Sequence, residues 1–265
     1  MLRNKIDHII DNELIYLQIS KSLLKPCFVF NLDDDNKEES LSKFGGSPIP
    51  NFNLGNHDLS FLGQIHTKKI NLLEKNLPAG ILYFFVNANK QSYPISREDY
   101  KIVFVEHSSL NFVEPTIDLD GRSINLNESY TVPSYQESIL NNFDYDEFHL
   151  QDLEEITNEA NSVLTNYDYD ISHQLLGHPQ AIQGTVRFWW AIRYLNFEEK
   201  EKYSTEELDQ IQAEEHNFIL LLQINFSDPK IEIDIFGDAI GYFGIHINDL
   251  KTKKFENTIF VTQNT

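Results

Sequence analysis

Two histidines, His173 and His178, are the side chains in this 265-residue chain whose type and spacing best suit metal binding or acid–base chemistry. Imidazole nitrogen is a common zinc ligand, and its pKa near neutrality also suits proton transfer. A spacing of five residues would turn the two rings about 140° apart on a helix, which is wrong for chelation from one face. In a turn they could converge, and His57 or His66 could join them. The simpler hypothesis is that His173 hydrogen-bonds the backbone and fixes the loop around Gly177.

Two glutamines, Gln64 and Gln223, each end an apolar run of strand length. A buried amide must find hydrogen-bond partners or it destabilises the fold. The first expectation is therefore structural, with each amide bracing a neighbouring glycine-rich loop. The functional alternative is a ligand cleft, because grooves between packed units are common ligand sites. The residues of this candidate cleft are Gly45, Gly46, Pro48, Gln64, Tyr83, His173, Gly177, His178, Gln183, Gln223 and Tyr242.

Recognised catalytic motifs are missing from the sequence. It contains no G-x-x-x-x-G-K-[ST] phosphate loop, no G-x-S-x-G nucleophile elbow and no H-E-x-x-H zinc helix. Cys27 is the single cysteine, which excludes a disulfide scaffold, and its apolar neighbours are typical of an inert packed thiol. We therefore expect no cofactor and no metal, and we assign no catalytic residue.

The chain carries 41 acidic and 21 basic side chains, a formal charge of −20. Three segments, residues 33–39, 143–159 and 198–215, together contribute −17. Phosphate binding requires clustered Lys and Arg, which argues against nucleic acid and anionic membrane as general partners. The acidic segments are either solvated faces of loops and helices or a surface that captures a basic partner protein. The candidate residues of such an acidic face are Glu154, Glu155, Asp209 and Glu214.

Apolar spacing predicts an amphipathic helix over residues 2–24, and acidic helices over 134–165 and 204–216. Ser204 or Thr205 is the expected N-cap of the last. Residues 185–196 fit a helix or a strand, because the apolar run around Trp189 and Trp190 has no diagnostic period. No segment suits a membrane span, and the N-terminus lacks the apolar core of a signal peptide, so we expect a cytoplasmic protein. Strands are predicted at residues 27–30, 59–65, 81–86, 101–106, 218–226, 231–236, 240–247 and 258–262.

The two halves of the chain resemble each other. When Gln64 is aligned with Gln223 without gaps, Tyr83 meets Tyr242, and six aligned positions between residues 64 and 89 are identical. A Gly-Pro loop precedes each copy. We interpret the pattern as an internal duplication that gives an α+β fold, mainly antiparallel sheet, in two pseudo-repeated halves that share one core. An N-terminal helix and acidic helices between the halves complete the prediction.

The predicted organisation is a single domain over residues 1–265. Its parts are an N-terminal helix and strand (1–40), a first half (41–133), a helical acidic insert that includes the 173–183 loop motif (134–216), and the end of the second half (217–265).

Several of these segments also resemble a known family. In order along the chain they are SKFGGSP at 42–48, LSFLGQI at 59–65, LPAGILYFF at 77–85, HQLLGHP at 173–179 with Gln183, LLLQI at 220–224, and GDA at 237–239. They resemble the successive blocks of the bacterial YwqG-like family, a domain of unknown function, from residue 42 to about 250. The resemblance implies an α+β fold on antiparallel sheet and implies no reaction. The chain departs from the family at residues 56–58, NHD, where a Trp-Pro often follows the Gly-Gly loop.

Three functional hypotheses follow. In the first, a non-catalytic protein binds a basic partner, and its most concrete form is an immunity-type protein that blocks a basic nuclease-like toxin. In the second, an enzyme or small-molecule-binding protein uses a cleft between the two halves, with His173 as acid or base. In the third, Trp189, Trp190, Tyr83 and Tyr242 bind a carbohydrate or a peptide. The clustered acidity and the missing catalytic motifs favour the first.

Overall fold

The computed structural model describes most of the chain. The described residues are 23–32, 42–48, 54, 58–68, 70, 77–89, 95–106, 121–142, 150–165, 173–231 and 239–264. The helix predicted over residues 2–24 and the strand predicted over 231–236 lie almost wholly outside them, as does His57.

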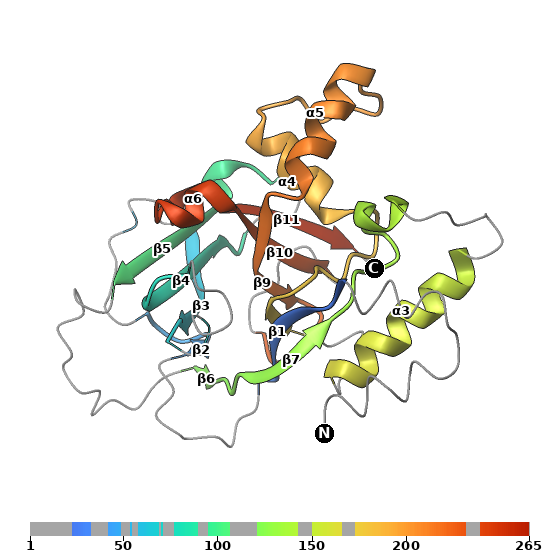
Figure 1. Ribbon diagram of the computed structural model, residues 1–265. Coiled ribbons are helices and arrows are strands. Elements are labelled where there is room, and N and C mark those ends of the chain that lie inside the picture. Colours follow the sequence, from blue (N-terminus) through green and yellow to red (C-terminus); the bar gives the residue numbers. More distant parts are fainter. Residues whose placement is uncertain are drawn as a thin grey trace.

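Antiparallel strands form two sheets (Figure 1). The six-stranded sheet has the order β11-β10-β9-β8-β1-β7, and the five-stranded sheet has the order β5-β4-β3-β2-β6. The strands of the first are β1 (Lys25–Phe30), β7 (Asn127–Thr131), β8 (His173–Leu176), β9 (Phe218–Asn225), β10 (Ala239–His246) and β11 (Ile259–Asn264). Those of the second are β2 (Lys43–Phe44), β3 (Leu59–His66), β4 (Gly80–Asn87), β5 (Tyr100–Glu106) and β6 (Arg122–Ser123).

The described helices lie around the six-stranded sheet: one packs on β7, the next packs on β10 and β11, a third packs on that second helix, and the last follows β10. They are α3 (Leu150–Thr165), α4 (Val186–Tyr194), α5 (Thr205–Glu215) and α6 (Ile247–Lys251), with 3-10 turns η2 (Arg97–Asp99), η4 (Ser138–Asn142) and η7 (Phe255–Asn257). In Figure 1 the α4–α5 hairpin stands above the sheets, and α3 lies beside β7 on another side of the molecule. Among the described residues, no helix has the length and apolarity needed to span a membrane.

Aromatic side chains join the two sheets into one core. Phe84 of β4 contacts Phe243 of β10 edge-on with 5.1 Å between ring centroids, and Phe30 stacks on Phe44 at 5.5 Å. The opposite face of the six-stranded sheet packs on α4, where Trp190 is fully buried and its indole lies against Gly244. A Cβ at Gly244 would stand 2.4 Å from that indole, so glycine is required for α4 to approach the sheet this closely.

The expected α+β class with antiparallel sheet is confirmed. Helix α5 begins at the predicted cap, where the Ser204 hydroxyl accepts from the main-chain N–H of Glu207. The ambiguous segment 185–196 is the helix α4. Of the acidic helices predicted over 134–165, the structure describes α3, and within residues 134–142 it has the short turn η4 in place of an α-helix. Residues 173–176, expected as part of a loop, form a strand between β1 and β9.

The central strands of the two sheets share local features. In one sheet Gln64 pairs with Tyr83, and in the other Gln223 pairs with Tyr242. Each pair of strands also contains one register shift, and each shift leaves one leucine of the first strand unpaired: Leu62 in β3 and Leu221 in β9. Gln64 and Gln223 each lie two residues before the end of their strand, so both glutamines are within strands and not at their ends.

Candidate functional site

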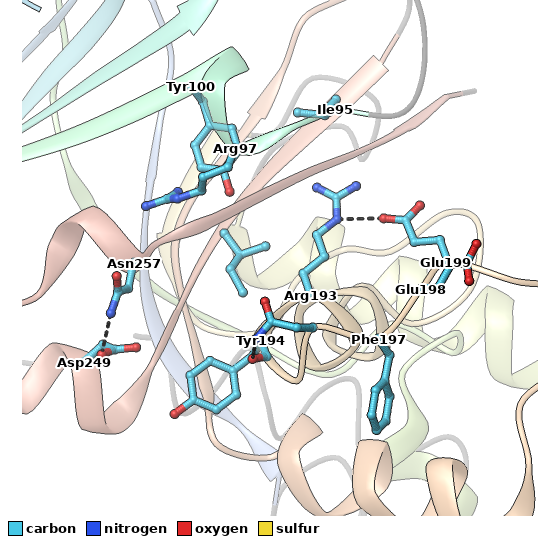
Figure 2. Close-up of a pocket in the computed structure, with 12 residues that line it drawn as sticks. Ile95, Arg97, Tyr100, Arg193, Tyr194, Phe197, Glu198, Glu199, Asp249 and Asn257 are labelled. Carbon is cyan, nitrogen blue, oxygen red and sulfur yellow. Dashed lines mark hydrogen bonds and ion pairs between the residues drawn. The ribbon is translucent and has the colours of Figure 1, made fainter.

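A groove of about 970 Å³ lies where the end of α4 faces η2 and η7 (Figure 2). We call it the inter-sheet groove, because its walls come from both sheets. The five-stranded sheet contributes the start of β5 and the turn before it, and the six-stranded sheet contributes β11 and the helices packed on it. Its lining residues are Ile95, Arg97, Tyr100, Arg193, Tyr194, Asn196, Phe197, Glu198, Glu199, Asp249, Asn257 and Ile259.

Two arginines are anchored at the start of β11, the edge strand of its sheet, one on Thr258, which precedes the strand, and one on Phe260 within it. Arg97 Nη1 donates to the Thr258 carbonyl at 2.6 Å, and Arg193 Nη1 donates to the Phe260 carbonyl at 2.7 Å. Carbonyls two residues apart on one edge of a strand point the same way. The two guanidinium groups therefore cap neighbouring carbonyls from two segments that are distant in sequence, and Figure 2 shows them on opposite sides of the groove.

Each anchored arginine has a second partner. The guanidinium carbon of Arg97 lies 4.8 Å from the centre of the Tyr100 ring, a cation–π contact. Arg193 Nε donates to Glu199 Oε1 at 2.9 Å, so its charge is neutralised inside the groove. Both cations of the groove are thus held by the protein itself.

Carboxylates dominate the remaining polar wall. Asp249 accepts from Asn257 Nδ2 at 2.9 Å, and Glu198 is exposed in the segment that follows α4. The Tyr194 ring stacks on His246 with 4.3 Å between centroids. Burial raises the pKa of the Tyr194 hydroxyl, and the charges of Asp249 and Glu214 raise it further. The groove therefore combines aromatic surface with negative charge, which suits a cationic group better than an anionic one.

A second pocket of about 350 Å³ lies further along β11. Arg193 and Glu199 line both pockets, so their ion pair stands at the boundary. The other lining residues of this second pocket are Gln183, Trp189, Val261, Thr262, Gln263 and Asn264.

The predicted cleft residues are mostly interior. Of the eleven, Gln183 lines one of these two pockets, and the others line neither. Gly45, Gly46 and Pro48 follow β2 in a turn where both glycines have positive φ. The buried members are Gln64, Tyr83, His173, His178, Gln223 and Tyr242. A ligand role for this set stays a prediction. The inter-sheet groove was not predicted from the sequence.

His173 makes a buried pair with a carboxylate. Its Nδ1 accepts from the main-chain N–H of Asn225 at 3.1 Å, so its Nε2 carries the proton and donates to Asp228 Oδ2 at 3.0 Å. This hydrogen bond lowers the pKa of Asp228. The ring also stacks on Phe30 with 5.4 Å between centroids. These contacts match the expectation that His173 bonds the backbone, although it braces the end of β9.

His178 is held as a neutral ring. Its Nε2 donates to the Leu23 carbonyl at 2.6 Å, and its main-chain N–H donates to Thr131 Oγ1 at 2.9 Å. Burial, with the nearby charges of Lys25 and Arg187, keeps its pKa well below the ordinary value. The two histidines thus have separate partners, and no three metal-ligating side chains gather among the residues that the structure describes.

Amide side chains brace the loop between β8 and α4. The main-chain N–H of Gln180 donates to Gln223 Oε1 at 2.9 Å, and the Gln180 carbonyl accepts from the Tyr242 hydroxyl at 2.8 Å. Gln263 Oε1 accepts from the main-chain N–H of Ile182 at 2.8 Å. The structural expectation for Gln223 is confirmed, and Gln263 serves the same purpose.

The four candidate residues of the acidic face do not form one patch. Glu154 and Glu155 are exposed on α3, while Asp209 is exposed on α5, and these helices lie on different sides of the molecule in Figure 1. Glu214 is half-buried, and its Oε2 bonds His246 Nε2 at 3.1 Å.

A buried charged cluster around Arg187 was not predicted from the sequence. Arg187 Nε donates to Glu137 Oε2 at 2.8 Å, and the Ser138 hydroxyl donates to Glu215. Burial raises the pKa of Glu137. Burial, together with repulsion from Glu137, raises the pKa of Glu215 to about 7, against the hydrogen bond from Ser138 and the charge of Arg187. Glu215 belongs to an acidic run, but it falls four residues after Ile211, on the buried face of α5.

We expect Gly177→Ala to destabilise the protein more than Gly184→Ala. Both glycines have positive φ, +77° and +79°, so alanine at either costs about 1 to 2 kcal/mol of backbone strain. A Cβ at Gly177 would also stand 2.5 Å from Thr131 Oγ1, whereas nothing lies within 4 Å at Gly184. The extra overpacking should cost about 1 to 3 kcal/mol in the free energy of unfolding, measured by urea denaturation. Equal losses would contradict the close packing of Gly177.

We expect Glu215→Gln to flatten the pH dependence of stability. The folded carboxyl has a pKa of about 7, against an ordinary value of 4.5 for glutamate, so folding binds protons between these two pH values. The free energy of unfolding therefore falls as the pH rises through this interval. Glutamine mimics the protonated form, and at pH 8.5 it should raise the free energy of unfolding by about 1 to 3 kcal/mol, with little gain at pH 4.5.

The measurement is urea denaturation of both proteins across this pH range. Glu206→Gln, which removes the same charge from an exposed position on α5, should leave the slope unchanged. An unchanged slope in Glu215→Gln would contradict the assignment.

Comparison with known proteins places the chain in a family. A family model described as "Domain of unknown function (DUF1963)" matches residues 42–263, from β2 to the end of β11. No curated protein matches the chain. The narrower YwqG-like resemblance stays a prediction. Because the match covers 222 of the 265 residues, including the five-stranded sheet and every residue that lines the groove, the chain belongs to the DUF1963 family, a domain of unknown function.

Proposed function

We propose that this protein is a non-catalytic binding protein that takes a basic partner protein at the inter-sheet groove. The observation that carries the proposal is the charge state of that groove. Its two arginines are held by β11, and one of them is neutralised by Glu199. Glu198 and Asp249 stand beside Tyr194 and Phe197, an arrangement that suits a lysine or arginine side chain.

The α4–α5 hairpin extends the negative surface beyond the groove. Glu198, Glu201, Glu206 and Asp209 are exposed on the hairpin or on the segment between its helices. Lys200 compensates part of this charge through its ion pair with Glu207, in which Nζ lies 2.7 Å from Oε1. A field of this sign accelerates encounter with a positively charged protein. An immunity-type role, in which the partner is a basic nuclease-like toxin, is the most concrete form of this proposal.

We infer that the two sheets are pseudo-repeats of one unit. The pairing of Gln64 with Tyr83 and of Gln223 with Tyr242, and the shifts at Leu62 and Leu221, support the inference. In this interpretation the groove is the junction of the two halves. A cytoplasmic location remains a prediction from the sequence.

A second candidate function is small-molecule binding or catalysis in the same groove. Its size favours this candidate, since about 970 Å³ is in the range of small-ligand sites. His173, the expected acid or base, is buried against Asp228 and does not line the groove. A small-molecule binder therefore has more support than an enzyme that uses His173.

We expect reversal of charge on the hairpin to slow association with the basic partner. The variant is Glu201→Lys with Asp209→Lys, and both positions are exposed. The partner is first captured from the host lysate at low salt, released at high salt and identified by mass spectrometry. Its association rate is then measured by surface plasmon resonance at two ionic strengths. The rate constant should fall about 10-fold or more at low salt and lose much of its salt dependence.

The matched control is Glu154→Lys with Glu155→Lys on α3, which changes the net charge equally on another side of the molecule. It should slow association far less. Equal effects of the two double variants would show that only net charge matters, and an unaffected hairpin variant would reject the hairpin as the capture surface.

A further inference from the structure

We propose that the inter-sheet groove and the pocket beyond it form one channel for an extended, arginine-bearing segment of the partner, divided by the Arg193–Glu199 ion pair. This inference rests on the proposed binding of a basic protein. It adds the shape of the bound segment, its chemistry, and the residue pair whose carboxylate receives its guanidinium group.

The two pockets follow a single strand. Ile259 lines the groove, Asn264 lines the second pocket, and β11 runs between them. A strand advances about 3.4 Å per residue, so the two ends are about 17 Å apart. That length matches an extended segment of about five residues.

The edge of β11 limits how such a segment can bind. The carbonyls of Thr258 and Phe260 already accept from Arg97 and Arg193, and the Asn264 N–H donates to Gln183 Oε1 at 3.4 Å. A peptide that joined the sheet as a new strand would need these groups. The bound segment is therefore recognised through its side chains.

The dividing pair offers a place for a guanidinium group. The side chain of Glu199 is 39% exposed and that of Arg193 is 19% exposed, so an incoming cation meets the carboxylate first. Glu199 can accept from the incoming guanidinium with its second carboxylate oxygen while it stays paired with Arg193, and Arg193 is also held by the Phe260 carbonyl. Glu198, next to this carboxylate, adds a second negative charge, and Trp189 in the second pocket offers an aromatic face to a cation.

The experiment uses two tryptophans of different exposure in the full-length protein. Trp190 is fully buried, whereas Trp189 is half-buried and lines the second pocket. Acrylamide quenching of tryptophan fluorescence therefore reports on Trp189, and Trp189→Phe identifies its share of the signal. The probe is the capped pentapeptide Gly-Arg-Gly-Arg-Gly, and the reference peptides are capped Gly-Arg and the pentapeptide with citrulline in place of arginine.

We expect the arginine pentapeptide to reduce the quenching constant of Trp189 about twofold. The dipeptide is too short to reach both pockets and should leave it unchanged. Glu199→Gln should weaken pentapeptide binding about fivefold, measured by isothermal titration calorimetry. Glu159→Gln, an exposed carboxylate on α3 with the same charge change, should leave the affinity unchanged.

Several results would overturn the proposal. Equal binding of the citrulline peptide would remove the charge requirement, and equal weakening by Glu159→Gln would reduce the effect to net charge. Binding without protection of Trp189 would confine the ligand to the groove. Glutarate, a dicarboxylate, tests the opposite charge preference. If it bound more tightly than the arginine peptide, Arg97 and Arg193 would be ligands for an anion. In any of these cases, slower association of the hairpin variant (Glu201→Lys with Asp209→Lys) with the partner would still support the proposed function. Only the channel would then be rejected.

Discussion

The loop between β8 and α4 is buried over residues 178–181 and partly buried at Ile182, so its main-chain groups there must find hydrogen-bond partners. Gln223, Tyr242 and Gln263 supply these partners from three adjacent strands of the six-stranded sheet. Their contacts fix where α4 begins, and Gly244 lets the helix approach the sheet. The position of α4 then decides where Arg193, Tyr194 and the acidic segment after them stand. The groove thus depends on buried amides that never touch it.

The sequence predicted those parts of the fold in which local pattern and tertiary environment agree. Aromatic and branched runs located the central strands, and Ser204 with Glu207 located the start of α5. It failed at β8, because His173 and Gln174 are polar and pair with Asp228 and with buried carbonyls, which is typical of a loop when only the sequence is read. It also failed to decide 185–196, since the apolar run around Trp189 and Trp190 has no period that distinguishes a helix from a strand.

The candidate site was less predictable for a different reason. Arg97 and Arg193 are brought together by main-chain carbonyls of β11, and a carbonyl leaves no trace in residue identity. Burial also divides the acidic residues into two groups that composition treats alike. Asp209 faces solvent, whereas Glu215, on the same helix, shares a buried cluster with Glu137 and Arg187. The spacing of four residues from Ile211 to Glu215 places both side chains on one face of the helix, which indicates burial of Glu215. The neighbouring acidic residues made this pattern hard to recognise.

The arginine caps on β11 have a consequence for how molecules of this protein meet each other. An edge strand with free carbonyls is a template on which a second chain can polymerise, and natural proteins block such edges. Here the blocking groups are also walls of the groove. Loss of either arginine would uncover part of a sheet edge, so the side chains that shape the groove also protect β11 from pairing with a second copy of the chain.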